Sequence, residues 1–378
     1  MSLKGNIKVR ILIFSFLVTA LVITLTFTGC GKIATAEQET AAGEESEVEG
    51  DNELGAEEGE EEGSQATVKE ITGNINIFSG LEISDSVKDD RPIAIMVDND
   101  PRGRPQSGLI YADIVFEVVD EGDVTRYVAI YSSNEAEVIY PIRSARIYYA
   151  EIARSLDPIY VFWGTYEQCF DPIKKLDMDV LDANNMGYVT GTNSGWRDYS
   201  RSTVSWISAL ISTTAIKEDA INFGYSLKEG QSPLRFKKDA EDSERGDVSD
   251  ITIDFSSEIF KAYFEYNGEN NNYLKYVGGS PHTDYDTGSQ ITVNNVIVMI
   301  TDIEGPIDTD GHMVVRTTGT SDNSKAFFFM DGNVIEGTWE RSSAFDPFTY
   351  RDENGDTILF NRGSTWVALI QDTDMLTY

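Results

Sequence analysis

The sequence predicts an α+β protein, with an N-terminal α/β-type lobe followed by a mostly antiparallel β C-terminal domain. Up to about Phe236, apolar runs of strand length alternate with helical patterns, as in proteins with a layered α/β core. A charged break follows at Lys237–Asp250, and after it apolar and polar residues alternate at a period of two. The chain has 378 residues, which is enough for two such domains and a tail.

Residues 1–30 form a predicted lipoprotein signal peptide. Its basic start contains Lys4, Lys8 and Arg10. An uncharged apolar run, Ile11–Thr28, follows and ends in FTGC, which resembles the lipobox of bacterial lipoproteins, although Phe27 replaces the usual aliphatic residue. Cys30 is therefore the predicted site of lipidation, including palmitate. The alternative is an uncleaved anchor, because the run approaches the ~20 residues that span a bilayer.

Residues 31–71 are predicted to be a disordered acidic tether. The stretch Glu37–Gln65 is rich in Glu, Gly, Ala and Ser and has no aromatic residue, so it cannot bury enough apolar surface to offset the entropy of ordering. An acidic tail that binds a metal or a partner is the alternative. The net charge of the whole chain is −34, which argues against nucleic acid as a partner, because phosphate backbones require a basic footprint.

The N-terminal α/β domain is predicted over residues 72–236. Its expected strands are Ile93–Val97, Asp113–Val119, Val124–Tyr131 and Pro158–Trp163. A helix is expected between the last two, since apolar residues recur there at helical spacing from Ala145 to Leu156. Ser144 stands where the N-cap of that helix belongs. Two further helices are expected at Tyr166–Leu176 and Val204–Phe223.

The C-terminal β domain is predicted over residues 250–378. Its expected strands are Ile251–Phe255, Ala262–Tyr266, Tyr273–Val277, Val293–Thr301, Val314–Thr318, Ala326–Met330 and Thr365–Ile370. Three turn dipeptides, Asn267-Gly268, Asp331-Gly332 and Asn354-Gly355, are typical of tight hairpins. The sequence therefore favours hairpin-connected antiparallel strands.

Polar side chains that no apolar core requires are interleaved with the first strands. These candidate ligand-binding residues are Asp98, Asn99, Arg104, Gln106, Glu117, Glu121, Arg126, Arg143 and Arg146. Arginines and carboxylates beside buried strands are costly unless they pair or bind something. Three interpretations follow: a structural ion-pair network, a site for an anionic group, or catalysis by Asp98, Glu117 or Glu121. Nearby arginines keep carboxylates ionised, which is unfavourable for a general acid.

Arg143 and Arg146 flank the predicted helix start, where the helix dipole already places partial positive charge. An anion between the two arginines would resolve this conflict. That anion is either a side chain, with Glu117 and Glu121 as the candidates, or a group on a ligand.

The stretch that holds these residues and the C-terminal part of the chain contain sequence blocks that carry a resemblance. The blocks are RPQSGL (Arg104–Leu109), ADIVFE (Ala112–Glu117), EGDVTRY (Glu121–Tyr127), PIRSAR (Pro141–Arg146), NNVIVM (Asn294–Met299), EGTW (Glu336–Trp339) and RGSTWV (Arg362–Val367). In order and spacing they resemble the YerB-like family of bacterial lipoproteins, from roughly residue 75 to the end. The resemblance implies a two-domain envelope lipoprotein and supplies no reaction. The family tends to have histidines where this chain has Phe162–Tyr166 and Ser202–Trp206, so a mechanism that uses them does not transfer.

Other chemistries find weaker support. Cys169 has no histidine close in sequence to generate a thiolate. His282 lies in a Gly-rich loop, GGSPHTDYD, and is interpreted as a structural or binding residue. The DTDG of Asp308–Gly311 and the DENGD of Asp352–Asp356 do not complete a calcium loop. No catalytic residue, metal or cofactor is therefore predicted.

The sequence as a whole predicts a lipid-anchored, non-catalytic protein on the extracytoplasmic face of the cell membrane. With Cys30 lipidated no internal disulfide is possible, which suits a Gram-positive envelope. Its predicted partners are the membrane, through the lipid, and either peptidoglycan or another wall polymer, or a membrane partner protein. The alternatives are a carboxylate-dependent cell-wall glycan hydrolase or transferase, and a scaffold for wall-synthesis enzymes.

Overall fold

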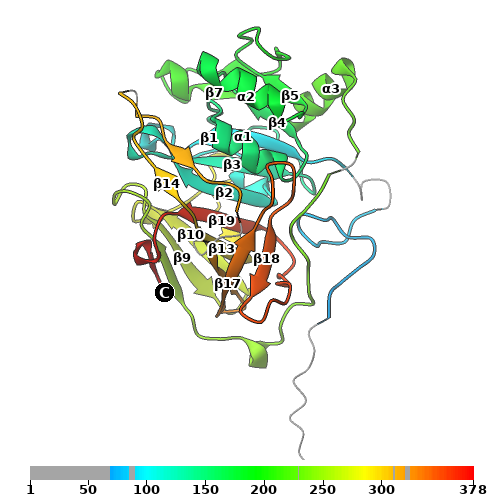
Figure 1. The fold of residues 1–378 in the computed structure, drawn as a ribbon, viewed down its shortest axis with the longest axis vertical. Coiled ribbons are helices and arrows are strands. Elements are labelled where there is room, and N and C mark those ends of the chain that lie inside the picture. The colour runs from blue at the N-terminus through cyan, green and yellow to red at the C-terminus, as the bar shows by residue number, and fades with distance from the viewer. Residues whose placement is uncertain (1–68, 85–89, 229, 310, 320–323) are drawn as a thin grey trace, which may run out of the picture. The chain divides into compact units, whose positions relative to one another are not determined.

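A ten-stranded mixed sheet runs through both halves of the chain (Figure 1). The computed structural model describes residues 69–84, 90–228, 230–309, 311–319 and 324–378, which all belong to one compact unit, Gln65–Tyr378. From edge to edge the strands are β18 (Thr349–Asp352), β17 (Asn333–Glu340), β16 (Lys325–Met330), β13 (Asn295–Ile300), β19 (Thr365–Ile370), β2 (Ile114–Val119), β3 (Thr125–Tyr131), β1 (Ile93–Asp98), β4 (Ile159–Phe162) and β5 (Val180–Asp182).

The two halves of the chain meet in the middle of this sheet. β19 runs parallel to β2, with Thr365 opposite Ile114 and Leu369 opposite Val118. On its other side β19 runs parallel to β13. Because strands of both halves form one sheet, the expected separate α/β lobe is not confirmed. The mostly β character of the chain is confirmed.

A second sheet packs against one face of the large one. Its strands are β11 (Ser280–Pro281), β10 (Asn272–Val277), β9 (Ala262–Asn267), β8 (Asp250–Ile253) and β20 (Leu376–Thr377), with β12 (Thr292–Val293) beside β10. Phe264 and Tyr273 of this sheet share a buried apolar cluster with Tyr127 and Trp366 of the large sheet. Two small two-stranded sheets complete the strands: β14 (Ile303–Glu304) with β15 (Val314–Val315), and β6 (Trp196–Arg197) with β7 (Ala209–Leu210).

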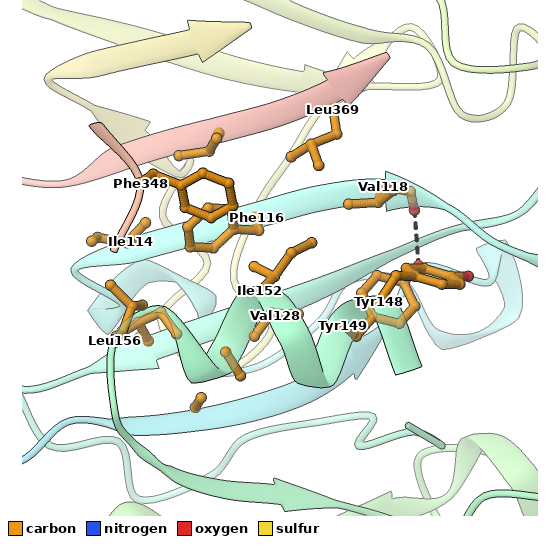
Figure 2. Packing of buried hydrophobic residues seen from close by; sticks show 14 of the residues in the cluster. Ile114, Phe116, Val118, Val128, Tyr148, Tyr149, Ile152, Leu156, Phe348 and Leu369 are labelled. Carbon is orange, nitrogen blue, oxygen red and sulfur yellow. Dashed lines mark hydrogen bonds between the residues drawn. The ribbon is translucent and has the colours of Figure 1, made fainter. Parts of the chain in front are cut away.

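The opposite face of the large sheet is covered by helix α1 (Ile147–Arg154). Its Tyr149 and Ile152 lie against Phe116 and Val128, and Figure 2 shows the helix lying across the strands that carry them. The Tyr149 hydroxyl donates to the Val118 carbonyl at 3.0 Å. The apolar face predicted for this helix is therefore its buried face.

Two helix starts differ from the sequence prediction. α1 begins at Ile147 with Arg146 as its N-cap, because the Ser144 hydroxyl instead donates to the Trp163 carbonyl at 3.2 Å. The α-helix within the predicted Val204–Phe223 is α3 (Thr213–Phe223), which Ser212 caps. The residues before it form a short 3-10 helix, Ser205–Ile207, and β7. A third helix, α2 (Phe170–Lys175), lies within the predicted Tyr166–Leu176.

The hairpin predicted at Asp331-Gly332 joins β16 to β17. Both residues have positive φ, 55° and 64°, as a tight turn between twisted antiparallel strands requires. The strand β17 itself had no counterpart in the sequence prediction, because its buried residues are confined to its C-terminal part.

The predicted boundary at Lys237–Asp250 gives the first testable expectation. The segment 238–247 is largely exposed, so limited trypsin digestion should cut there, at Lys238, before it cuts within the strands. The fragments should nevertheless elute together from a gel-filtration column, because β19 stays paired with β2. Separate elution of the two fragments in native buffer would contradict the shared sheet.

The predicted signal peptide lies outside the described residues, as do residues 31–68 of the predicted tether. Within the part of the chain that the structure describes, no helix is both long and apolar enough to cross a membrane.

Candidate functional site

Strand alternation distributes the candidate residues over the two faces of the large sheet. Asp98 at the end of β1 lies opposite Arg126 on β3, and both side chains face the α1 side. Glu117 on β2 lies opposite Tyr127 and faces the second sheet, where the Trp366 indole meets it. Since neighbouring residues of a strand point to opposite faces, one sequence motif builds two separate polar clusters.

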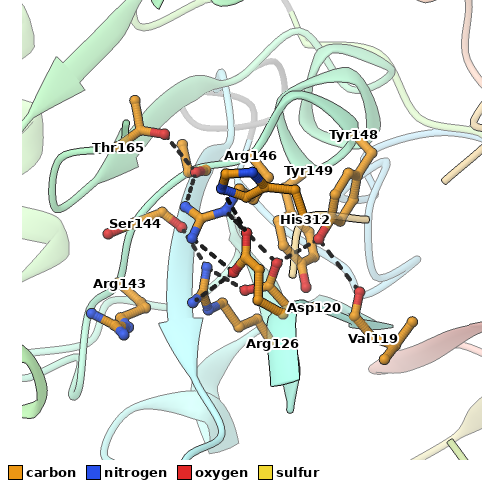
Figure 3. A network of polar contacts seen from close by, with 12 residues as sticks. Val119, Asp120, Arg126, Arg143, Ser144, Arg146, Tyr148, Tyr149, Thr165 and His312 are labelled. Carbon is orange, nitrogen blue, oxygen red and sulfur yellow. Dashed lines mark hydrogen bonds and ion pairs between the residues drawn. The ribbon is translucent and has the colours of Figure 1, made fainter. Parts of the chain in front are cut away.

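The arginine cluster lies on the α1 side and is a set of close ion pairs (Figure 3). It consists of Asp98, Asp120, Glu121, Arg126, Arg143 and Arg146. The fully buried Asp120 pairs with Arg126 and accepts a hydrogen bond from the Tyr148 hydroxyl at 2.5 Å. Glu121 accepts from Arg146 Nη2 at 2.8 Å, which places a carboxylate beside the cation at the N-cap of α1. The anion required at this helix start is thus internal for Arg146.

Arg143 is the least compensated member of the arginine cluster. Its Nε lies 3.1 Å from Asp98 Oδ2, and its side chain is 25% exposed. Among the described residues its two terminal nitrogens make no hydrogen bond, and Figure 3 draws its side chain apart from the other contacts. The predicted partners Glu117 and Glu121 do not pair with it.

A polar cavity of about 260 Å³ opens beside these groups. Its walls are Asp98, Asp100, Glu121, Val124, Arg126, Arg143, Arg146 and His312. His312 reaches the cavity from the loop between β14 and β15, where it stacks on Tyr166 with ring centres 4.2 Å apart. Its Nδ1 lies 2.6 Å from Asp308 Oδ2. Residues of both sequence halves therefore contribute to one cavity.

Two charged side chains that line the cavity, Glu121 and Arg143, have shifted pKa values. Burial alone would raise the pKa of Glu121, but the hydrogen bond from Arg146 and the nearby Arg126 lower it to about 2. Burial lowers the pKa of Arg143, Asp98 opposes this effect, and the neighbouring Arg126 and Arg146 add to it. Burial is the main cause of this lowered pKa, and the positive charges of the other two arginines are a secondary cause.

The lysine cluster lies on the other face and contains the remaining candidates. It consists of Asn99, Arg104, Gln106, Glu117, Thr125, Lys275, His282 and Trp366. Glu117 is fully buried and accepts from the Thr125 hydroxyl at 2.9 Å and from the Trp366 indole at 3.0 Å. The Lys275 ammonium, also 0% exposed, lies 3.6 Å from Glu117 Oε2 and 4.3 Å from the Trp366 ring centre. Burial lowers the pKa of Lys275, while Glu117 opposes that shift.

Several residues of these clusters were not predicted as site residues. Asp120 stands just after β2 and was passed over between Glu117 and Glu121. The sequence did contain a signal that could have identified Lys275, because the inward positions of β10 are Tyr273, Lys275 and Val277. A lysine at an inward position of an alternating strand indicates a buried partner.

The predicted lipidation site Cys30 lies outside the described residues. Cys169 is a buried free thiol at the start of α2. No cluster of three or more potential metal ligands occurs among the residues that the structure describes.

Comparisons with known proteins agree on one family. The model described as "Protein of unknown function (DUF3048) N-terminal domain" matches residues 78–226, and the corresponding C-terminal domain model matches residues 251–367. "Putative lipoprotein YerB" of Bacillus subtilis (strain 168) is 30% identical over 303 residues, which are 79% of this chain and 86% of that protein. The crystal structure of the YerB protein from Bacillus subtilis matches with a TM-score of 0.69 at 27% identity, covering 80% of this chain and 98% of that one.

Proposed function

Because this chain belongs to the YerB family, defined by the DUF3048 N- and C-terminal domains, we propose that it is a lipid-anchored envelope protein that binds an anionic wall polymer. The contact would be made at the arginine cluster, and no bond of the polymer would be broken. The proposal rests on two observations: the Bacillus relative is named a lipoprotein, and Arg143 of the cavity has terminal nitrogens that make no hydrogen bond within the described residues.

The anchor rests on Cys30 and on the basic and apolar segment before it. Replacing the cysteine, Cys30→Ala, removes the only thiol that could receive lipid there. We expect the variant to appear in the medium or to remain as an uncleaved precursor, and wild-type protein to stay with the membrane. Immunoblots of membrane and medium fractions measure this. A Cys30→Ala variant that fractionates and migrates as wild type does would rule out the lipid anchor, whereas Cys169→Ala serves as the matched control.

The observation that carries anion binding is the state of Arg143. Among the described residues, Asp98 is the carboxylate within ion-pair distance of Arg143. The terminal nitrogens of Arg143 make no hydrogen bond within those residues, and Arg143 lines the cavity. A guanidinium presents paired N–H groups that match a carboxylate or a phosphate. The protein is acidic overall, so a local basic site of this kind is what an anionic polymer could use.

Binding fits the geometry better than cleavage does. A glycosidase of the usual kind needs one protonated carboxyl and a second carboxylate on either side of the same bond. Glu117 and Glu121 lie on opposite faces of the sheet, and Glu117 is fully buried. Arg146 keeps Glu121 ionised, as its low pKa shows. Asp98 is held by Arg143 and is itself buried.

Cosedimentation with purified cell wall tests the proposed function. Full-length protein in detergent should pellet with wall material that retains its phosphate-bearing polymers. It should stay in solution when those polymers have been removed chemically, or when salt screens the charges. Equal sedimentation with intact and stripped wall would contradict anion binding. The amount of protein that pellets without any wall material gives the background.

A further inference from the structure

A second cavity, of about 280 Å³, lies on the other side of the large sheet, at the end of the β10–β11 hairpin. Its polar walls are Arg104, Ser280, His282 and Thr283, and Val277 and Pro281 supply apolar surface. A volume near 300 Å³ lies at the lower end of the range of small-molecule sites. None of these residues lines the cavity of the arginine cluster.

Arg104 is a cation held in one place without a counter-ion. Its Nε donates to Asn99 Oδ1, its Nη1 to the Ile259 carbonyl and its Nη2 to the Asn99 carbonyl, each at 2.9 Å. Among the described residues no carboxylate lies within ion-pair distance of it. Glu117, the carboxylate of this cluster, is matched by Lys275. The wall of the cavity therefore carries a fixed, uncompensated positive charge.

His282 lines the same cavity, and its ring carries an unpartnered acceptor atom. The Gln106 amide nitrogen donates to the Asp98 carbonyl at 3.1 Å and to Asn99 Oδ1 at 3.2 Å, which turns its oxygen toward His282. His282 Nε2 lies 2.9 Å from that oxygen and must carry the hydrogen. Nδ1 then has a lone pair, and this buried atom has no hydrogen-bond partner.

The imidazole also stays neutral. Burial holds the pKa of His282 well below its usual range, and the charges of Lys275 and Arg104 lower it further. The residue is 2% exposed, so an unsatisfied Nδ1 carries a free-energy cost that a donor group would remove.

We propose that this cavity binds a small hydroxylated anion, a polyol phosphate or a hydroxy acid, whose anionic group pairs with Arg104 and whose hydroxyl donates to Nδ1 of His282. Both residues line this one cavity. This cavity is separate from the arginine cluster, so the proposal can be tested independently of wall-polymer binding.

Isothermal titration of the full-length protein in detergent tests the site with four probes. Glycerol 3-phosphate and glycerate carry both required groups, inorganic phosphate lacks the hydroxyl-bearing carbon chain, and glycerol lacks the charge. We expect saturable binding of at least one of the first two, and binding at least tenfold weaker for phosphate and glycerol. No saturable heat with either complete probe, or equal binding of the incomplete ones, would overturn the proposal.

Variants show whether that binding occurs in this cavity. Ser280→Trp fills the cavity from an exposed position without touching the core, and it should abolish the heat of binding. Asn270→Trp places the same side chain at the exposed opposite end of the β9–β10 hairpin and should bind as wild type does. Arg104→Ala should weaken binding at least tenfold. Retained binding in Ser280→Trp would place the ligand elsewhere and refute the assignment.

Discussion

Replacing Glu117 with alanine is expected to lower the free energy of unfolding by about 3–5 kcal/mol, the usual effect of leaving a buried charge without its partner. Both Glu117 and Lys275 are completely buried, and among the described residues no other carboxylate lies within ion-pair distance of Lys275. Removing the carboxylate also leaves the Thr125 hydroxyl and the Trp366 indole without their acceptor. Urea denaturation followed by tryptophan fluorescence measures the change.

A double variant separates the cost of leaving the Lys275 charge unpaired from the cost of the lost hydrogen bonds. Glu117→Gln keeps an acceptor for Trp366, and Lys275→Met removes the cation, so the pair should recover most of the stability. Glu241→Ala breaks an exposed ion pair with Lys238 and should leave the free energy of unfolding close to that of wild type. A Glu117→Ala variant as stable as this control would show that Lys275 is not buried as described.

Arg126→Ala is the second large effect that we expect, again about 3–5 kcal/mol of lost stability. Arg126 is almost fully buried and pairs with Asp120, whose carboxylate is 0% exposed. Without the guanidinium, the Asp120 carboxylate retains the Tyr148 hydroxyl and the more distant Arg146, 3.8 Å away. Burial already raises the pKa of Asp120, and without Arg126 this pKa should rise further, so the variant should be less destabilised at acidic pH, where the carboxyl is protonated, than at neutral pH.

Thermal and urea unfolding of Arg126→Ala should be compared with those of Arg126→Ala combined with Asp120→Asn. The second substitution removes the stranded charge and should restore part of the loss. A single variant within about 1 kcal/mol of wild type would mean that the arginine cluster does not stabilise the fold.

Local sequence patterns predicted most strands, but they could not predict which distant strands pair with each other. β1, β2, β3 and β10 follow from apolar runs and alternation, and the Asp331-Gly332 turn follows from its dipeptide. The parallel pairing of β19 with β2 joins residues some 250 positions apart, and no local signal encodes which distant strand becomes a neighbour. The sequence break at Lys237–Asp250 therefore indicates a linker and not the edge of a separate sheet.

The candidate site was predicted as a set of residues and not as an arrangement. Asp98, Glu121, Arg126, Arg143 and Arg146 do come together, as the shared motif indicated. Glu117 lies across the sheet from them, because residue parity along β2 decides the face and the prediction did not apply it. Gln106 lies there too, beside His282, but it belongs to the loop between β1 and β2. Lys275 and His312 come from the C-terminal half, so their presence depended on the pairing that the sequence could not show.

The central claim is that Arg143 is placed for a ligand, and Arg143→Lys tests it most directly. Lysine keeps a cation for Asp98 but lacks the paired terminal nitrogens of the guanidinium that lines the cavity, so the fold should tolerate it. Binding to intact wall material and melting temperature should be measured on the same preparation, with Arg102→Lys, an exposed arginine paired with Asp100, as the control. We expect the melting temperature of Arg143→Lys to stay close to that of wild type while its wall binding falls at least tenfold and that of the control does not. Wild-type binding by a stably folded Arg143→Lys variant would contradict the account.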